Sequence, residues 1–360
     1  MTNEWIHSIV QKIRRNARLV GRFVPICAFI VPTLILYYLY PSSFELMWKG
    51  RTFYFFFLWL VFLEIVLEWD NIPKNTPLEP RSIRTVILVV CLLLPTVYIV
   101  VGNYFGLNAA ILNFAKQNNV SPNVVDFVPL STEYLVLTAL FAMTVLLFYG
   151  TDGLKTHMLS ALFLGAIGTI YMIDNLYPWG KFTPFQIFVP VTATLAANVL
   201  TSMGYKTNLN EIRDPNYGWL QSLRVTDPNN PLRTVKFEIA WPCAGVESLL
   251  IYTVTILLFL KNTPIPWKQR AVYFLIGAVV TFLINVLRVV TIFIIGMNTG
   301  GLSAETEQFH NFYGQLYSIT WIISYPLIIM GSRTLWAKIN AMRQRGTSTI
   351  GSFESVNGKL

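Results

Sequence analysis

Three residues of types that catalyse acyl transfer lie at or near the ends of apolar runs in the second half of the chain. Cys243 follows a proline in WPCAGVESLL, Arg288 lies within INVLRVVTIF, and His310 lies in QFHNFYG. A thiolate attacks carbonyl carbons, an imidazole transfers protons, and a guanidinium stabilises an oxyanion or binds a peptide carboxylate. Together these residues predict nucleophilic catalysis with Cys243 as the nucleophile.

The spacing of basic residues predicts that Cys243 and Arg288 lie at the same depth in a membrane. Cys243 precedes Lys261 by as many residues as Arg288 follows Arg270, and a short basic loop joins the two apolar runs. At about 1.5 Å of rise per residue, each side chain would stand roughly 27 Å from that loop. His310 directly precedes the last apolar run, so we expect all three residues to converge near the outer membrane surface.

The stretch around Cys243 favours an ionised thiol. Pro242 is typical of a first helical turn, so we expect Cys243 to lie at the N-terminal end of a helix. Unpaired N–H groups and the helix dipole lower the pKa of a thiol there. Gly245 would let a substrate backbone approach closely, and Trp241, directly upstream, is a further candidate for substrate contact.

Two polar residues on the same helices are candidates to support the site. Glu247 is a candidate structural partner for Arg288 or for a main-chain group. Asn285 precedes Arg288 by three residues, which places both on one helix face. Each catalytic candidate also has an ordinary structural interpretation, because boundary cysteines are more often inert and arginines near the membrane surface extend to the headgroups. His310 taken alone is most often an interfacial hydrogen-bonding residue.

Composition places the chain among membrane proteins. Of the 360 residues, 54% are hydrophobic and only 12% are charged, whereas soluble domains have about 25% charged residues. The net charge of +9 is explained by Lys and Arg that set the topology, and we expect no nucleic-acid binding. The three histidines are scattered and the three cysteines lack metal spacing, so we expect neither a metal site nor a cofactor.

Nine apolar runs predict an all-α polytopic membrane protein with about eight or nine transmembrane helices. The runs are 23–40, 52–69, 84–103, 134–149, 157–173, 184–203, 243–260, 271–297 and 312–335. Basic residues at both ends of the chain predict that both termini are cytoplasmic, which requires an even number of crossings. One run must then be split or fail to cross, and 157–173 is the least regular of them.

The runs and loops divide the chain into five segments. They are a basic cytoplasmic N-terminal segment (1–22), N-terminal transmembrane helices (23–203), an extracytoplasmic segment (204–242), catalytic transmembrane helices (243–335) and a cytoplasmic tail (336–360). Within 204–242, the stretch TVKFEIAW alternates, with Val235, Phe237, Ile239 and Trp241 on one face. We expect it to form a small β-hairpin with GWLQSLRVT across the turn DPNNP, directly before the catalytic helix.

The motifs CAG (243–245), NVLR (285–288) and FH (309–310), in this order on successive membrane helices, resemble the exosortase/archaeosortase family of membrane cysteine transpeptidases. The stretch WKGRTFYFFFLWLVFLEIVLEWD (48–70) is most similar to the archaeal branch. The resemblance implies that Cys243 is the nucleophile, Arg288 stabilises the oxyanion or the substrate, and His310 is the acid and base. It covers residues 184–335 well and the first 180 residues more loosely.

The resemblance further implies a substrate and a location. Members of the family cleave a C-terminal sorting signal of secreted surface proteins, made of a short motif, a transmembrane helix and a basic cluster. They are thought to transfer the protein to a lipid or another acceptor. By this resemblance the chain is a multi-pass protein of the cell membrane, with its active site facing outside and with secreted proteins and membrane lipid as partners.

Two other classes of function remain open from the residues alone. Arg288, Glu64 and Glu247 lie within apolar runs, where ionisable residues also mark the pathways of transporters and channels. No inverted repeat supports that interpretation. A non-catalytic assembly factor of the membrane is the third class, and for it Cys243 would be dispensable.

Overall fold

The structure, a computed structural model, describes residues 23–46, 49–67, 83–177, 186–214, 218–261 and 263–357. The predicted basic segment 1–22 lies outside the described residues. Each predicted apolar run corresponds to a helix of the described part. These helices are α2 (Val24–Leu39), α3 (Phe53–Leu67), α4 (Ile83–Tyr104), α6 (Val128–Thr156), α7 (Met158–Leu176), α9 (Phe188–Ser202), α10 (Val246–Lys261), α11 (Trp267–Thr299) and α13 (Gly314–Asn357).

Four of the described helices, α4, α6, α7 and α11, are long and apolar enough to cross a membrane by length and composition. Helices α2, α3 and α9 are apolar but shorter. The fold is therefore mostly helical and has several candidate membrane spans, whereas eight or nine crossings stay a prediction. The run 157–173, the least regular in sequence, forms α7, one of the four long helices.

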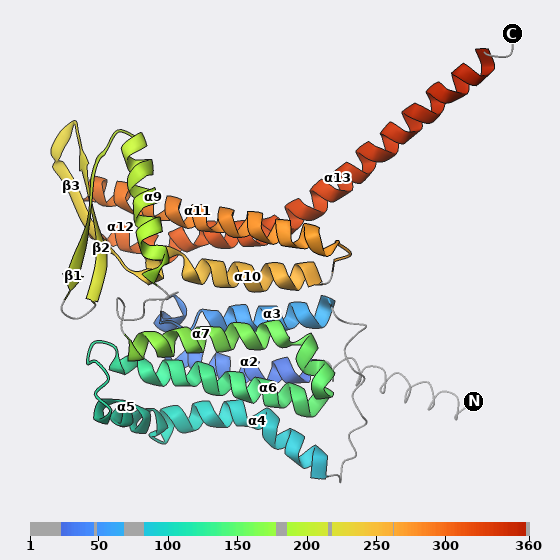
Figure 1. The fold of residues 1–360 in the computed structure, drawn as a ribbon. Helices are drawn as coiled ribbons and strands as arrows, with labels where there is room; N and C mark the ends of the chain where they lie inside the picture. Colours follow the sequence, from blue (N-terminus) through green and yellow to red (C-terminus); the bar gives the residue numbers. More distant parts are fainter. Residues whose placement is uncertain are drawn as a thin grey trace, which may run out of the picture.

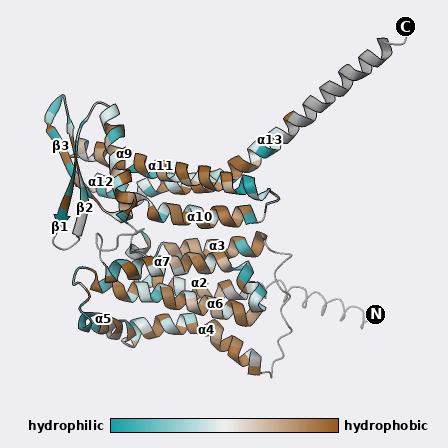
Figure 2. Cartoon of the chain, in the orientation of Figure 1, coloured by the Kyte–Doolittle hydropathy of each residue, from teal (hydrophilic) through white to brown (hydrophobic). Residues whose placement is uncertain are grey.

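The helices form two groups that lie side by side (Figure 1). One group contains α2, α3, α4, α6 and α7, and the other contains α10, α11 and α13. The helices of both groups consist mostly of hydrophobic residues, as expected for helices in a membrane (Figure 2). The short helices α5 (Leu107–Gln117) and α12 (Ala304–Gln308) lie at the end of the molecule where the β-sheet is found (Figure 1).

A buried carboxylate joins α3 to α7 within the first group. Glu64 in α3 has no exposed surface, and it accepts hydrogen bonds from the backbone N–H groups of Leu159 (3.0 Å) and Ser160 (3.3 Å) and from the Ser160 hydroxyl. These N–H groups lie in the first turn of α7, so the carboxylate caps that helix and interacts favourably with its dipole. Glu64 thus has a structural role in the fold.

The polar segment after α9 forms a three-stranded antiparallel sheet of β1 (Lys206–Asp214), β2 (Gly218–Asp227) and β3 (Asn230–Ile239), in that order. The predicted hairpin is confirmed: Leu223 of β2 lies opposite Phe237 of β3. Strand β1 was not predicted, because KTNLNEIRD contains only two apolar residues. The inner face of the sheet packs on α9 and α11, and Phe237 contacts Phe293 of α11 with ring centroids 5.1 Å apart.

Candidate active site

The three residues singled out in the sequence come together beside the sheet. The Sγ atom of Cys243 lies 3.5 Å from Nε2 of His310. The guanidinium of Arg288 donates from Nη2 to the backbone carbonyl of His310 at 2.8 Å. All three side chains line one pocket with a volume of about 380 Å³. Because three separate elements supply them, tertiary packing rather than local sequence brings them together.

Cys243 lies in a 3₁₀ turn, η4 (Trp241–Ala244), and α10 begins only at Val246. The expectation that the thiol occupies the first turn of the membrane helix was therefore wrong by a few residues. Gly245 separates the two elements with a φ of 89°, in the left-handed region that favours glycine. The chain must turn at Gly245 before it can enter α10, so the thiol stands outside the helix.

Side chains from two neighbouring helices hold this turn by its carbonyl groups. Asn285 of α11 donates from Nδ2 to the carbonyl of Cys243 at 2.9 Å, and Thr192 of α9 donates to the carbonyl of Ala244 at 3.4 Å. A Cβ atom on Gly245 would lie 2.9 Å from the side chain of Asn285. Asn285, rather than a substrate, therefore lies against Gly245 in this structure, and the glycine permits that contact.

Trp241 connects the turn to the first helix group. Its side chain is buried, and the indole N–H donates to Oδ1 of Asp174 in α7 at 3.3 Å. The other carboxylate oxygen of Asp174 forms an ion pair with Nζ of Lys49 at 2.7 Å, and Lys49 also donates to Oδ1 of Asn175 at 2.8 Å. Both charged side chains are almost fully buried. This network anchors the residues directly before Cys243 and is not evident in the sequence.

His310 lies in a single turn of π-helix, η5 (Phe309–Tyr313), directly before α13. Such turns are frequent at functional sites. Its Nδ1 atom lies 3.1 Å from Oδ1 of Asn311, so a proton on Nδ1 is shared with that amide and Nε2 faces the thiol. The nucleophile Cys243 contacts the base His310, and the base in turn contacts the amide of Asn311 that orients it, an arrangement typical of covalent catalysis. Sequence reasoning missed Asn311, although it is adjacent to His310.

Arg288 is buried and is held by the start of α13. With its amide oxygen turned toward Arg288, Gln315 accepts from both Nη1 (3.0 Å) and Nη2 (2.9 Å). A Cβ atom on Gly314 would lie 2.9 Å from Nε of Arg288, so only glycine leaves room for the guanidinium there. Among the described residues Nε has no hydrogen-bond acceptor. Neither Gly314 nor Gln315 was identified from the sequence.

Glu247 is buried in the first turn of α10. Within the described part of the chain, its Oε1 atom has no hydrogen-bond partner and no ion pair joins it to Arg288. Of the two partners considered for Glu247, Arg288 or a main-chain group, the described part of the chain therefore shows no ion pair with Arg288.

The electrostatics favour a charged thiol and imidazole, both of which lie outside the membrane-spanning helices. Burial acts to raise the pKa of the Cys243 thiol, but the hydrogen bond from His310 and the charges of His310 and Arg288 lower the pKa below its ordinary value. The hydrogen bond to Cys243 raises the pKa of the His310 imidazole, against the effects of burial and of Arg288. The pair is thus suited to exist as thiolate and imidazolium.

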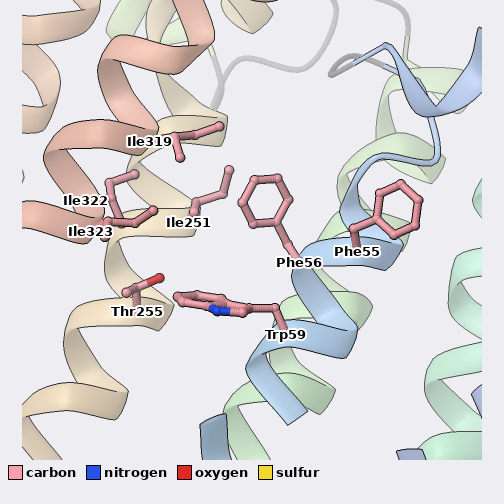
Figure 3. A pocket seen from close by; sticks show the side chains of 8 residues that line it. All are labelled: Phe55, Phe56, Trp59, Ile251, Thr255, Ile319, Ile322 and Ile323. Atoms are coloured by element: carbon pink, nitrogen blue, oxygen red, sulfur yellow. The ribbon is translucent and has the colours of Figure 1, made fainter. Parts of the chain in front are cut away.

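A second cavity, of about 280 Å³, lies between the two helix groups and lacks groups for chemistry (Figure 3). Its walls are Phe55, Phe56 and Trp59 of α3, Ile251 and Thr255 of α10, and Ile319, Ile322 and Ile323 of α13. Among the described residues, no group of three His, Cys, Asp or Glu side chains is placed to hold a metal ion. The Cys243 pocket, in contrast, contains a thiol, an imidazole and a guanidinium.

Fold and site together define a polytopic helical membrane protein with a cysteine, a histidine and an arginine in one pocket. The family model described as transmembrane exosortase matches residues 47–326, which is most of the chain and includes all three residues. The chain belongs to this family. Comparisons with curated proteins and with solved structures found no match.

Proposed function

We propose that this protein is a membrane-embedded cysteine transpeptidase, with Cys243 as nucleophile, His310 as acid and base, and Arg288 as oxyanion stabiliser. The observation that carries the proposal is the contact of 3.5 Å between Sγ of Cys243 and Nε2 of His310, in a pocket that Arg288 also lines. Membership of the exosortase family adds independent support.

The proposed reaction has two steps. The Cys243 thiolate attacks the scissile carbonyl, and the His310 imidazolium protonates the departing amine, which leaves a thioester on the enzyme. His310 then removes a proton from the acceptor, whose oxygen or nitrogen attacks the thioester and releases the thiol. The guanidinium of Arg288, which lines the pocket, provides the positive charge that stabilises the oxyanion of both tetrahedral intermediates.

The proposed substrate is a secreted protein that carries a C-terminal sorting signal of motif, transmembrane helix and basic cluster, and a membrane lipid or water is the proposed acceptor. This part of the proposal rests on the resemblance of the three motifs around Cys243, Arg288 and His310. The similarity of residues 48–70 to the archaeal branch supports placing the protein there. We further propose a cell-membrane location with the active site facing outside.

The proposal is tested by intact-mass analysis of a secreted protein with a C-terminal membrane helix, co-expressed with this protein or with its Cys243→Ala variant. We expect loss of the C-terminal segment only with the intact cysteine, and any mass added to the new end identifies the acceptor. Cys27→Ala and Cys91→Ala are matched controls and should process normally, since neither residue lines the pocket. Equal processing by Cys243→Ala would disprove the proposal.

A transporter is the alternative function that makes a definite prediction about the structure. It would use the ionisable residues of the apolar runs as a pathway, but Glu64 caps α7 and Arg288 is bound to Gln315 and to the His310 carbonyl. No observation favours this alternative over the transpeptidase.

A further inference from the structure

Strand β3 meets the pocket of Cys243 along its edge. Four consecutive residues of β3, Lys236 to Ile239, line this pocket. Successive side chains of a strand point to opposite faces of the sheet, so a cavity on one face would contact only every second residue. A cavity that contacts four residues in succession must lie beside the strand, next to its backbone.

This edge of β3 is open in the described part of the chain. The strand order is β1-β2-β3, and β3 pairs with β2 alone. Every second residue of an edge strand directs its N–H and C=O groups away from the sheet, where a further strand can bind them. The opposite wall of the pocket is helical and contains Val289, Ile292 and Phe293 of α11, so it cannot complete the sheet.

The open edge leads directly to the nucleophile. Ala240, the residue after β3, has an extended backbone, and the turn with Cys243 follows at once. At about 3.3 Å per residue, the four pocket residues of β3 span roughly 13 Å, the length of about four residues of an extended peptide. A segment lying along this edge would therefore bring one of its peptide carbonyls to the thiol.

We propose that the protein substrate binds as an added β-strand along the open edge of β3, with its scissile bond at Cys243. This inference rests on the proposed function and names its mode of recognition: backbone hydrogen bonds give affinity, and alternate side chains give specificity. One set of side chains faces the apolar wall formed by Ile292 and Phe293. The other set meets Lys236 and Glu238, which are exposed and 3.8 Å apart, so charge matters at those positions.

The test uses the full-length enzyme in detergent and synthetic peptides that span the cleavage point found by intact mass. Each backbone nitrogen before the scissile bond is methylated in turn, which removes one N–H donor and leaves the side chains unchanged. We expect kcat/KM to fall about three- to tenfold at every second position and to change less than twofold at the positions between. Equal losses at adjacent positions, or no losses, would overturn strand addition.

A photo-crosslink provides the second measurement. In the Cys243→Ala background, p-benzoylphenylalanine replaces Glu238 of β3 or, as the control, the exposed Glu211 of β1, which lies two strands away and on the other face of the sheet. We expect an adduct with uncleaved substrate from position 238 and none from position 211. Absence of the adduct at 238, while the wild-type enzyme cleaves the same substrate, contradicts this inference alone. Failure of the wild type to cleave any candidate would instead remove the proposed function.

Discussion

At the residue scale, the site depends on one hydrogen-bonded pair whose members shift each other toward the charged state. The pKa of Cys243 is lowered and that of His310 is raised, and the amide of Asn311 contributes to the latter. A thiolate exists above the pKa of the thiol, and an imidazolium exists below the pKa of the imidazole. Both shifts therefore favour the thiolate and imidazolium forms of the pair.

This arrangement predicts the pH dependence of alkylation. The rate of Cys243 modification by iodoacetamide should rise with pH through a midpoint below about 8.5, the ordinary thiol value. In His310→Ala the midpoint should move to higher pH, because burial raises the pKa of the thiol and His310 no longer lowers it. A midpoint unaffected by the loss of His310 would contradict the pairing.

Asn311→Ala should shift the alkaline limb of the pH profile of processing. Its hydrogen bond raises the pKa of His310, so its loss lowers that pKa and the imidazolium disappears at a lower pH. We expect the alkaline limb of kcat/KM to move to lower pH while the protein remains folded. Asn311→Asp, which keeps a hydrogen-bond acceptor for His310, is the control and should not move the alkaline limb to lower pH.

Arg288→Lys should reduce processing by about 10²-fold or more, as loss of an oxyanion donor does. A lysine ammonium cannot reproduce the planar fork that binds Gln315 and the His310 carbonyl together. The measurement is the rate of substrate cleavage, with thermal unfolding as the control for folding. Full activity of this variant would exclude the proposed role of the guanidinium.

At the element scale, the reactive groups lie on short irregular turns that longer helices hold. The 3₁₀ turn of Cys243 is fixed by Asn285 and Thr192, and the π turn of His310 is fixed by Arg288. Sites supported in this way keep their geometry because packed helices restrict the turn. The buried ion pair of Lys49 and Asp174 extends this support to the first helix group.

The support network predicts different results for its members. Asp174→Ala leaves Lys49 buried without its counter-charge and should destabilise the protein by about 3–5 kcal/mol. Trp241→Phe removes one hydrogen bond and should cost only about 1 kcal/mol. Thermal unfolding in detergent measures both. If both variants lost a similar amount of stability, the Lys49–Asp174 ion pair would contribute little beyond the hydrogen bond between Trp241 and Asp174.

At the scale of the whole molecule, the sheet and the N-terminal end of α10 lie at one end of the helices, and the loop between α10 and α11 lies at the other (Figure 1). Cys243 lies directly before α10, at the end with the sheet. The loop region contains Lys261, Lys268 and Arg270, and basic loops remain in the cytoplasm. A helix the length of α10 rises about 24 Å. This geometry favours an active site at the outer surface.

The orientation is tested with a membrane-impermeant maleimide on intact cells. In a Cys27→Ala/Cys91→Ala background, we expect Cys243 to be labelled from outside. Pro264→Cys, in the loop between α10 and α11 and introduced together with Cys243→Ala, should be labelled only after the cells are permeabilised. The reverse pattern would place the site in the cytoplasm.

The sequence by itself predicted the long helices, the hairpin of β2 and β3, and the residue types of the candidate site. Runs of apolar residues require helices in a membrane because only helices satisfy their own backbone groups there, and each run corresponds to a described helix. Alternation in TVKFEIAW predicted β3 because a half-buried strand has a period of two. The unusual placement of Cys243, Arg288 and His310 identified the candidate site, since local spacing predicted a common depth for Cys243 and Arg288.

Only the tertiary structure decided what supports those residues. Asp174 and Trp241 are far apart in the chain, and Gln315 reaches Arg288 only because α13 packs against α11. Strand β1 lacks an apolar pattern and is stabilised by its pairing with β2. The open edge of β3 likewise follows from the strand order. These features depend on contacts between distant segments, and local periodicity contains no information about such contacts.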